Sequence, residues 1–307
     1  MVLSFQAASV APVCGPGGGV TPQRHRRSGA ENGGKQVFRR GLGGVLAGTL
    51  LLAVTASAQA FDQADLDQLT RSKACPGCDL RRADLRLVDL RGADLKGANL
   101  RESELKGVDL SSADLSGADL RRAEVESAIL KDVDLRRALL AGTDFEKAKL
   151  HRAQLDEADM REVDLEKADL AGASLRNCDM REAELKRANL SGADLSGADL
   201  RRTDLERAQM DEAVLRDSKL AGADFDRADL RDAQLQNADM TGTKFERTSL
   251  VGANLSGASM KNARLYKADL SGAVLTGVSG LRQPQLDDAC GDGATRLPDG
   301  LTVPACR

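Results

Sequence analysis

A five-residue period runs through most of this chain and leaves few folds open to it. From Leu80 to Leu275, every fifth residue is Leu, Met, Phe or Val, which gives 40 consecutive blocks without an insertion or a deletion. Two residues before each of these apolar residues stands a small one, mostly Ala. The residue between the two is often Asp, and the other two positions are mostly polar, charged or Gly.

Neither a regular helix nor a regular strand can carry this period. An α-helix turns by about 100° per residue, so side chains five residues apart would spiral around it instead of forming one stripe. In a flat strand, a step of five places successive leucines on opposite faces. The period fits a chain that turns a corner every five residues, so that four corners close a square coil of about 20 residues. Stacked coils then pair at a β-like spacing of about 4.8 Å.

The rarer inward residues sort into columns when the chain is read with a period of twenty. Four methionines share one column and three phenylalanines share the next: Met160, Met180, Met240 and Met260, and Phe145, Phe225 and Phe245. Only Met210 falls elsewhere among these inward Met and Phe residues. A ring packs well on another ring, and Met adapts to irregular gaps. We therefore expect Met160 to stack on Met180 and Phe225 on Phe245.

The tandem blocks resemble those of the pentapeptide repeat family, whose motif reads Ala-(Asp/Asn)-Leu-X-X. Residues 191–200, which read SGADLSGADL, show the motif twice. The resemblance covers residues 78–277. It implies an all-β fold, namely a right-handed quadrilateral β-helix, which is a solenoid of about ten four-sided coils. It also implies that the central Leu or Phe and the small residue two places earlier face inward.

The first sixty residues differ from the repeats and predict an exported protein. Residues 1–34 are rich in Gly, Pro, Ser and Ala, which predicts disorder. An arginine pair then precedes an apolar run at residues 42–54, and small residues allow cleavage after Ala60. This layout is typical of a secretory signal peptide and predicts a periplasmic or secreted mature chain.

Three alternatives stay open for this leader. The arginine pair is compatible with a twin-arginine export route, although the rest of that motif matches poorly. The apolar run is compatible with an uncleaved anchor, but it is short for a membrane span and a cleavage site follows it. Translation from Val37 or nearby would make Met1 a misplaced start and leave Cys14 without a role.

Charged residues on the outer positions also recur every twenty residues. We call one such column the basic ladder: Lys147, Lys167, Arg187, Arg207, Arg227, Arg247 and Lys267. The column beside it, the acidic ladder, is interrupted by Lys186 and otherwise holds Glu126, Glu146, Glu166, Glu206, Asp226 and Glu246. On the adjoining side, a column of arginines holds Arg81, Arg101, Arg121, Arg161, Arg181 and Arg201. Like charges about 4.8 Å apart repel unless opposite charges flank them, so the pattern predicts a solvated ion-pair network. The functional interpretation is a striped surface that binds a charged partner.

Caps are expected at both ends, because a stacked solenoid otherwise exposes unpaired backbone edges. Residues 61–77 predict an N-terminal cap with a short helix, since Leu66 and Leu69 share a face and acidic residues occupy the first turn. Residues 278–307 predict a C-terminal capping hairpin, with a turn at Pro298-Asp-Gly and a disulfide between Cys290 and Cys306. Similar Cys-bounded tails occur in exported members of the family.

Cys75 and Cys78 flank a Pro-Gly pair at the start of the repeats. Redox-active pairs share this spacing, but Cys78 already fills the small inward slot of the first block, so we prefer a structural disulfide. A catalytic redox pair, free thiols and a different pairing remain as alternatives. Two Cys without another Cys or His nearby make no standard zinc site, so no metal is expected. Cys178 also fills an inward slot and is predicted to be an inert buried thiol.

Catalysis is not expected from these residues. Of the two histidines, His25 lies in the leader and His151 on an outer position, so a base for neutral pH is scarce. No block carries an insertion that would build a cleft, and the sequence shows no phosphate loop or activated nucleophile. We therefore predict neither catalytic residues nor a cofactor. The balance of 44 basic and 47 acidic residues also disfavours nucleic acid or a membrane surface as partner.

Two functions remain after these exclusions. We prefer an exported, non-catalytic rod that acts as a structural or protein-interaction module for an unidentified protein. Such a rod would be a monomer or a weak end-to-end dimer, with no membrane span in the mature chain. The alternative comes from the family resemblance, because some members mimic DNA and inhibit type II topoisomerases. A DNA mimic needs a strongly acidic surface, whereas residues 78–277 hold 39 acidic and 33 basic residues.

Overall fold

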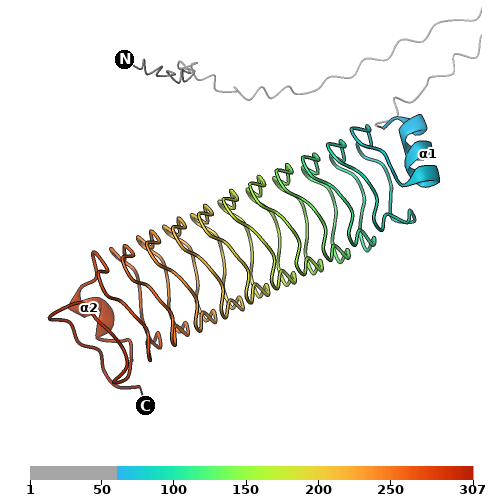
Figure 1. Ribbon diagram of the computed structural model, residues 1–307. Coiled ribbons are helices and arrows are strands. Elements are labelled where there is room, and N and C mark those ends of the chain that lie inside the picture. The colour runs from blue at the N-terminus through green and yellow to red at the C-terminus, as the bar shows by residue number, and fades with distance from the viewer. Residues whose placement is uncertain (1–60, 307) are drawn as a thin grey trace, which may run out of the picture. The chain divides into compact units, whose positions relative to one another are not determined.

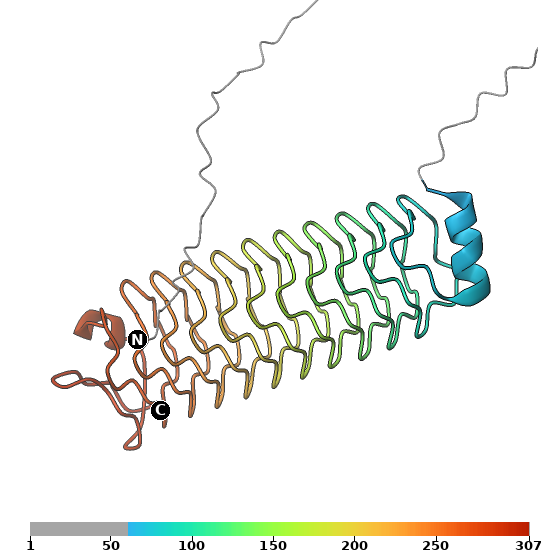
Figure 2. The same cartoon turned by 45° about the horizontal axis from the view of Figure 1, so that its top comes forward.

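The computed structural model describes residues 61–306, which form a rod of stacked coils with a short helix at each end (Figure 1). Parallel bridges join residues twenty apart, such as Asp194 to Val214, from one coil to the next. Each side of a coil contributes a single bridged residue, because the chain turns again within five residues (Figure 2). The chain is therefore a β-helical solenoid. No helix in residues 61–306 is long and apolar enough to cross a membrane.

The corners are tight turns with a left-handed residue. In the turn that starts at Leu195, the N–H of Ala198 donates to the carbonyl oxygen of Leu195 at 3.1 Å, and Gly197 has a φ of 69°. We call the two residues in the middle of such a corner the first and second turn positions. Gly adopts this φ without steric cost, whereas other residues are strained there. Arg187, with a φ of 57°, occupies the same second position in another corner, so this position is not restricted to Gly. The side chains at both turn positions point outward, and their residue types can vary.

Leu and small residues fill the interior, and the expected columns are confirmed. Met160 donates its backbone N–H to Asp179, the residue before Met180, at 2.8 Å, which places the two methionines in adjacent coils. The rings of Phe225 and Phe245 stack with their centroids 5.2 Å apart and their planes 16° apart. The coils are therefore built from twenty residues each, as the columns required.

Hydroxyl groups are accommodated in the small inward slots because the preceding coil supplies an acceptor. The Thr143 Oγ1 donates to the carbonyl oxygen of Leu120 at 2.7 Å, and the Thr203 Oγ1 donates to that of Met180 at 2.9 Å. A buried hydroxyl without a partner would destabilise the fold. This carbonyl column therefore lets Thr replace Ala without breaking the core, whereas Ser103 and Ser218 donate at 2.7 Å to the carbonyl three residues earlier in their own coil.

One side of the first coil departs from the regular pattern. Leu87 is fully exposed and Val88 is partly buried, and no bridge joins Asp89 to Asp109 in the described part of the chain. Val88 and Val108 occupy neighbouring coils of one column of small slots, where most coils hold Ala. Branched side chains in neighbouring coils do not by themselves break the pairing, because Thr143 and Val163 share a column of small slots and the bridge between Asp144 and Asp164 forms.

At the N-terminal end, α1 (Gln63–Ser72) covers the first coil and stands in for the coil that would precede it (Figure 1). Asp62 caps the helix by accepting from the N–H of Ala64 at 2.8 Å, and Leu69 is fully buried. The Asp65 carboxylate accepts the backbone N–H of Asp79 at 2.7 Å. In the other coils, such an N–H finds a carbonyl of the coil before it. The helix therefore supplies a hydrogen-bond acceptor for a backbone N–H at the edge of the first coil, which would otherwise be unpaired.

The C-terminal end differs from the expected hairpin, and that prediction was wrong. After α2 (Gln283–Leu286), Cys290 and Arg296 pair in parallel with the last full coil, and the bridge between Gly291 and Ala305 is also parallel. The reason is the open edge of that coil: the N–H of Leu270 donates to Cys290 at 2.7 Å. The start of the segment therefore continues the solenoid, and its end folds back beside Gly291 in parallel instead of as an antiparallel hairpin. The turn at Pro298 does form, since Leu301 donates to the Pro298 carbonyl at 3.3 Å.

The phenylalanine stack makes the first prediction. Replacing Phe225 and Phe245 by Leu, singly and together, should reveal a coupling free energy of about 0.5–1.5 kcal/mol, because the stacked rings interact beyond their burial. The free energies of unfolding in urea of the native protein, the two single variants and the double variant give this coupling by a double-mutant cycle. Phe145 and Phe225 lie in the same column but are not in adjacent coils, so their double variant should be additive and serves as the control. Equal additivity in both cycles would contradict the stack.

Candidate functional site

The charged corner of the rod is the most distinctive surface, because the acidic ladder occupies its first turn position and the basic ladder its second. Lys147 lies 2.9 Å from Glu146 of its own coil and 3.7 Å from Glu126 of the preceding coil. Lys167 repeats the arrangement, at 2.7 Å from Glu166 and 3.6 Å from Glu146. Each of these cations is therefore held between two carboxylates.

Farther along the rod, the same arrangement continues with arginines. Arg227 lies 3.8 Å from Glu206 and 4.0 Å from Asp226, and Arg247 lies 2.7 Å from Asp226 and 4.0 Å from Glu246. These exposed pairs each contribute only about 0–1 kcal/mol. Their importance is positional, because they hold four cations between six carboxylates along one corner.

Two members of the basic ladder lack such partners. Among residues 61–306, no carboxylate lies within 4.0 Å of Arg187 or of Lys267. Lys267 is instead placed 5.2 Å from the ring centre of Tyr266, which occupies the acidic ladder's position in that coil. The ladder is thus regular from Lys147 to Arg247 except at Arg187 and at Arg207, which contacts only Glu206 of its own coil.

A second set of ion pairs was missed by reasoning from columns alone. Nine arginines each bind, through two nitrogens, the Asp two residues earlier: Arg81, Arg86, Arg91, Arg121, Arg136, Arg161, Arg181, Arg201 and Arg231. The sequence signal is the triplet Asp-Leu-Arg or Asp-Met-Arg, which spans the bridged residue and the first turn position. These pairs, which we call forks, neutralise five of the six members of the column of arginines, since Arg101 follows Asn99 instead of an Asp.

The forks have a consequence for titration, seen most clearly at Asp84. Arg86 donates to its two carboxylate oxygens at 2.9 and 2.7 Å, and this hydrogen bonding lowers the pKa of Asp84 to about 2. The backbone N–H of Arg86 also donates to Oδ1, at 3.2 Å.

The second prediction follows for acid titration. The Asp84 carboxyl should titrate near pH 2 in the folded protein, and Arg86→Gln should move the midpoint toward the ordinary value of about 3.9. Because the folded-state pKa is depressed, the stabilisation is present above pH 4 or so and is lost as the pH falls toward about 2. Carboxyl ¹³C chemical shifts measure the midpoint. An unchanged midpoint in the variant would contradict the role of the fork.

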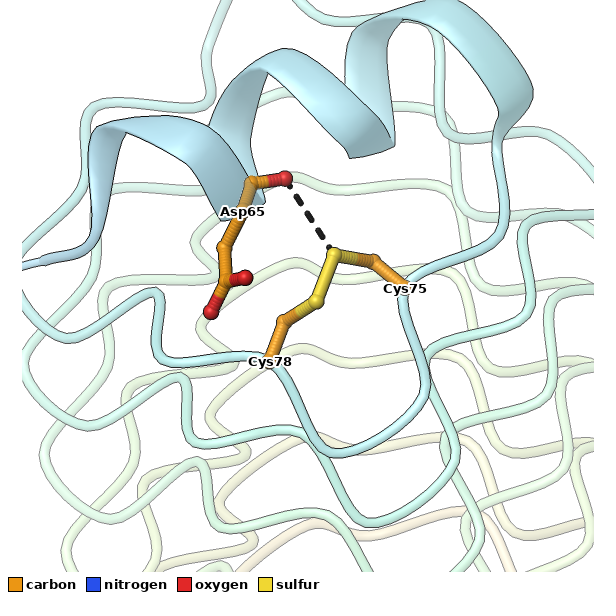
Figure 3. Close-up of side chains that lie close together, drawn as sticks. All are labelled: Asp65, Cys75 and Cys78. Carbon is orange, nitrogen blue, oxygen red and sulfur yellow. Dashed lines mark hydrogen bonds between the residues drawn. A yellow bond between two sulfur atoms is a disulfide. The ribbon is translucent and has the colours of Figure 1, made fainter.

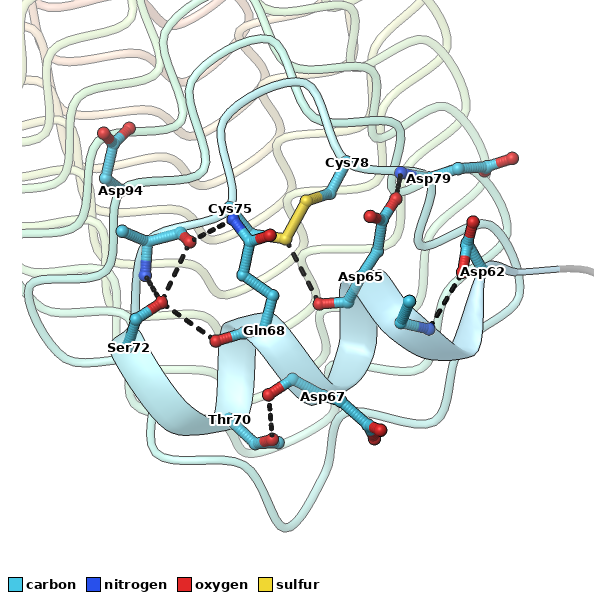
Figure 4. Close-up of a disulfide and its surroundings, with 12 residues drawn as sticks. Asp62, Asp65, Asp67, Gln68, Thr70, Ser72, Cys75, Cys78, Asp79 and Asp94 are labelled. Atoms are coloured by element: carbon cyan, nitrogen blue, oxygen red, sulfur yellow. Dashed lines mark hydrogen bonds between the residues drawn. A yellow bond between two sulfur atoms is a disulfide. The ribbon is translucent and has the colours of Figure 1, made fainter.

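Cys75 and Cys78 form a disulfide beneath α1 (Figure 3). Cys75 is fully buried and Cys78 is 6% exposed. The Cys75 sulfur lies 3.2 Å from the carbonyl oxygen of Asp65, and Gln68 donates to the Ala74 carbonyl at 2.9 Å (Figure 4). Thiol–disulfide exchange requires access for an attacking thiolate, which this packing restricts. The geometry therefore favours the structural interpretation over the redox one.

The two cysteines of the C-terminal cap form the second disulfide, Cys290–Cys306, with a sequence separation of 16 residues. Carboxylates lie near both disulfides, with Asp65 beside Cys75 and Cys78, and Asp269 beside Cys290 and Cys306. A sulfur bound in a disulfide is not a thiolate ligand, so these groups do not constitute metal centres.

The third prediction concerns this C-terminal disulfide. Replacing Cys290 and Cys306 by Ala should destabilise the cap by about 3 kcal/mol in the chain-entropy model and expose residues 291–305 to proteolysis. The matched Cys75→Ala, Cys78→Ala variant removes a shorter loop and should cost less. Limited proteolysis followed by mass spectrometry locates the cuts. Intact residues 291–305 in the first variant would show that the disulfide does not hold the cap.

Neither remaining candidate residue for chemistry lies in an activating environment. Cys178 is 1% exposed, donates to the Leu155 carbonyl at 2.9 Å, and has its pKa raised to about 12 by burial. His151 lies at a first turn position on the surface. His25, Cys14 and the leader lie outside the described residues.

The comparisons with known proteins agree with this architecture. The family profile described as pentapeptide repeats matches with 8 copies, over residues 75–101, 89–124, 128–166, 168–207, 208–247 and 240–277. Among solved structures, HetL from the cyanobacterium Nostoc sp. strain PCC 7120, described as involved in regulation of heterocyst differentiation, is 35% identical. That alignment covers 66% of this chain and 90% of HetL, with a TM-score of 0.63.

Two further structures share lower similarity. QnrB1, described as a plasmid-mediated fluoroquinolone resistance protein, is 20% identical, with coverage of 59% of this chain and 91% of QnrB1 and a TM-score of 0.28. A pentapeptide repeat protein from the thylakoid lumen of Arabidopsis thaliana is 27% identical, with coverage of 44% and 83% and a TM-score of 0.17. No curated protein matches the sequence.

Proposed function

Because this chain belongs to the pentapeptide repeat family, we propose that it is an exported, non-catalytic rod that binds a protein partner through its charged corner. The observation that carries the proposal is the ladder of cations between carboxylates, which presents charge at a fixed repeat of about 4.8 Å. Proteins of this family generally serve as structural or interaction modules. The coils would wind to the right, as in other members.

Export is the second part of the proposal and rests on the leader sequence. The apolar run at residues 42–54 and the small residues before Phe61 match a cleavable signal peptide. The two disulfides support this, because such bonds persist in oxidising compartments. The mature chain would start at Phe61, directly before the cap of α1.

The charge of the rod argues against the alternative of a DNA mimic. In nine blocks, the Asp at the bridged position is bound by the arginine two residues on, so its charge is neutralised within the block. A mimic of the DNA backbone must present unpaired negative charge at close intervals. The forks therefore favour a mixed-charge protein partner.

The fourth prediction tests export and binding together. The full chain with a C-terminal tag, produced in its source organism, should be recovered from the periplasmic or secreted fraction with Phe61 as its first residue. N-terminal sequencing and cell fractionation provide the measurement. A cytosolic protein that retains the leader would contradict export and would favour the topoisomerase alternative.

Binding is judged on the same material by a change in the ladder. Replacing Lys147, Lys167 and Arg227 by Glu should remove co-purifying proteins that the native rod retains. Replacing Arg81, Arg121 and Arg201 by Gln alters the fork side and is the matched control. Identical co-purification by all three proteins would count against the charged corner as the interaction surface.

A further inference from the structure

The acidic ladder has one break, and the break leaves a specific electrostatic gap. In the coils on either side, a ladder cation contacts carboxylates of its own coil and of the coil before it, as Lys167 and Arg227 do. At the break, Lys186 takes the place of the acid. Its ammonium group turns to Asp204, 3.1 Å away and outside the acidic ladder.

Two ladder arginines lose a partner as a result. Arg187 has no carboxylate within 4.0 Å in the described residues, and Glu166 of the coil before pairs with Lys167 instead. Arg207 keeps only Glu206 of its own coil, at 3.5 Å, because the preceding coil offers Lys186. The break therefore places cationic side chains together without the carboxylates that pair with such cations elsewhere in the ladder.

The surface is hollowed at the same place. A depression of about 160 Å³ is lined by Glu166, Lys186, Arg187, Glu206 and Arg207. A water molecule takes about 30 Å³ in the liquid, so the depression has room for a carboxylate group. Three of its five lining side chains are cations, and one of the three has no partner.

We propose that this depression binds a single Asp or Glu side chain of a protein partner, whose carboxylate completes the ladder beside Arg187. The inference rests on the proposed function and specifies the chemistry of the partner. A guanidinium binds a carboxylate through two parallel N–H donors, which gives the contact direction as well as energy.

The carboxylates that flank the depression determine what kind of anion fits. Glu166 and Glu206 lie in the adjoining coils, about 4.8 Å away along the rod on either side. A polyanion such as nucleic acid or polyphosphate would bring further negative charges against them. A single Asp or Glu that is flanked by neutral or basic residues avoids this repulsion. Its carboxylate contacts Arg187, and the flanking residues lie against Glu166 and Glu206.

An NMR titration of the mature rod tests the proposal. The probe is a blocked seven-residue peptide of alanines with one central Glu and a Lys two residues to each side, and the control peptide has Gln in place of Glu. At low ionic strength, where such contacts are least screened, the Glu peptide should shift the Arg187 Nε–H resonance and amides of residues 184–207. The shifts should saturate, and the Gln peptide should produce none of them.

Three variants make the result specific. Arg187→Gln should weaken binding by up to about fivefold, which is the effect expected from loss of one exposed ion pair. Lys186→Glu supplies the missing carboxylate from the chain itself, so it should abolish binding while the rod melts at no lower temperature. Arg161→Gln removes an exposed fork arginine outside the charged corner and should leave the affinity unchanged.

Several outcomes would overturn the site. These are unchanged binding by Lys186→Glu or Arg187→Gln, equal shifts with the Gln peptide, or shifts spread evenly along the ladder. Failure here is distinguishable from failure of the proposed function. A rod that retains its partner in cell extracts through Lys147, Lys167 and Arg227, yet shows no dependence on Arg187, would keep the charged corner and lose the carboxylate site.

Discussion

The pairing of each coil with the next at a separation of twenty residues is the constraint on which the whole structure depends. Every bridge between two residues of the repeats, 78–277, joins residue i to residue i+20, and each inward Leu or Ala lies on its equivalent in the neighbouring coil. An extra residue has to be accommodated outside the paired positions, as it is between Asp269 and Cys290, which pair 21 residues apart. The uninterrupted period from Leu80 to Leu275 therefore lets every coil pair with the next without such an adjustment.

This constraint explains which parts of the fold could be predicted from the sequence. Inward positions are specified by periodicity alone, so the Phe225–Phe245 stack could be inferred from spacing. The ends have no period. At the C-terminus, the turn signal at Pro298 was correct locally, but it could not reveal that Cys290 pairs with the last coil. Whether the C-terminal segment pairs with the last coil depends on the open backbone edge of that coil, and this edge forms only when the chain is folded.

The surface was predictable in part for a related reason. Columns at a spacing of twenty identified the ladders, because stacked coils place such residues side by side. The forks depend instead on a spacing of two, as between Asp199 and Arg201, where the chain bends from its bridged residue into the corner. The sequence also placed Lys186 in the acidic ladder, but not the direction of its side chain. Because Lys186 supplies no carboxylate, Arg187 has no partner in its own coil, and the Lys186 ammonium group contacts Asp204 instead.

The difference between the inward positions and the turn positions also explains why a break in the ladder is informative about function. The interior permits few residue types, whereas the turn positions tolerate Gly, Arg, Lys, Glu and Asn with the same backbone. Structure alone therefore does not require a cation at Lys186, and a Glu there would pair with both Arg187 and Arg207. Because each exposed ion pair contributes little to stability, the absence of these two pairs lowers the free energy of unfolding only slightly. The gain is an arginine whose donors remain available to another molecule, held in place by a rigid and otherwise neutralised surface.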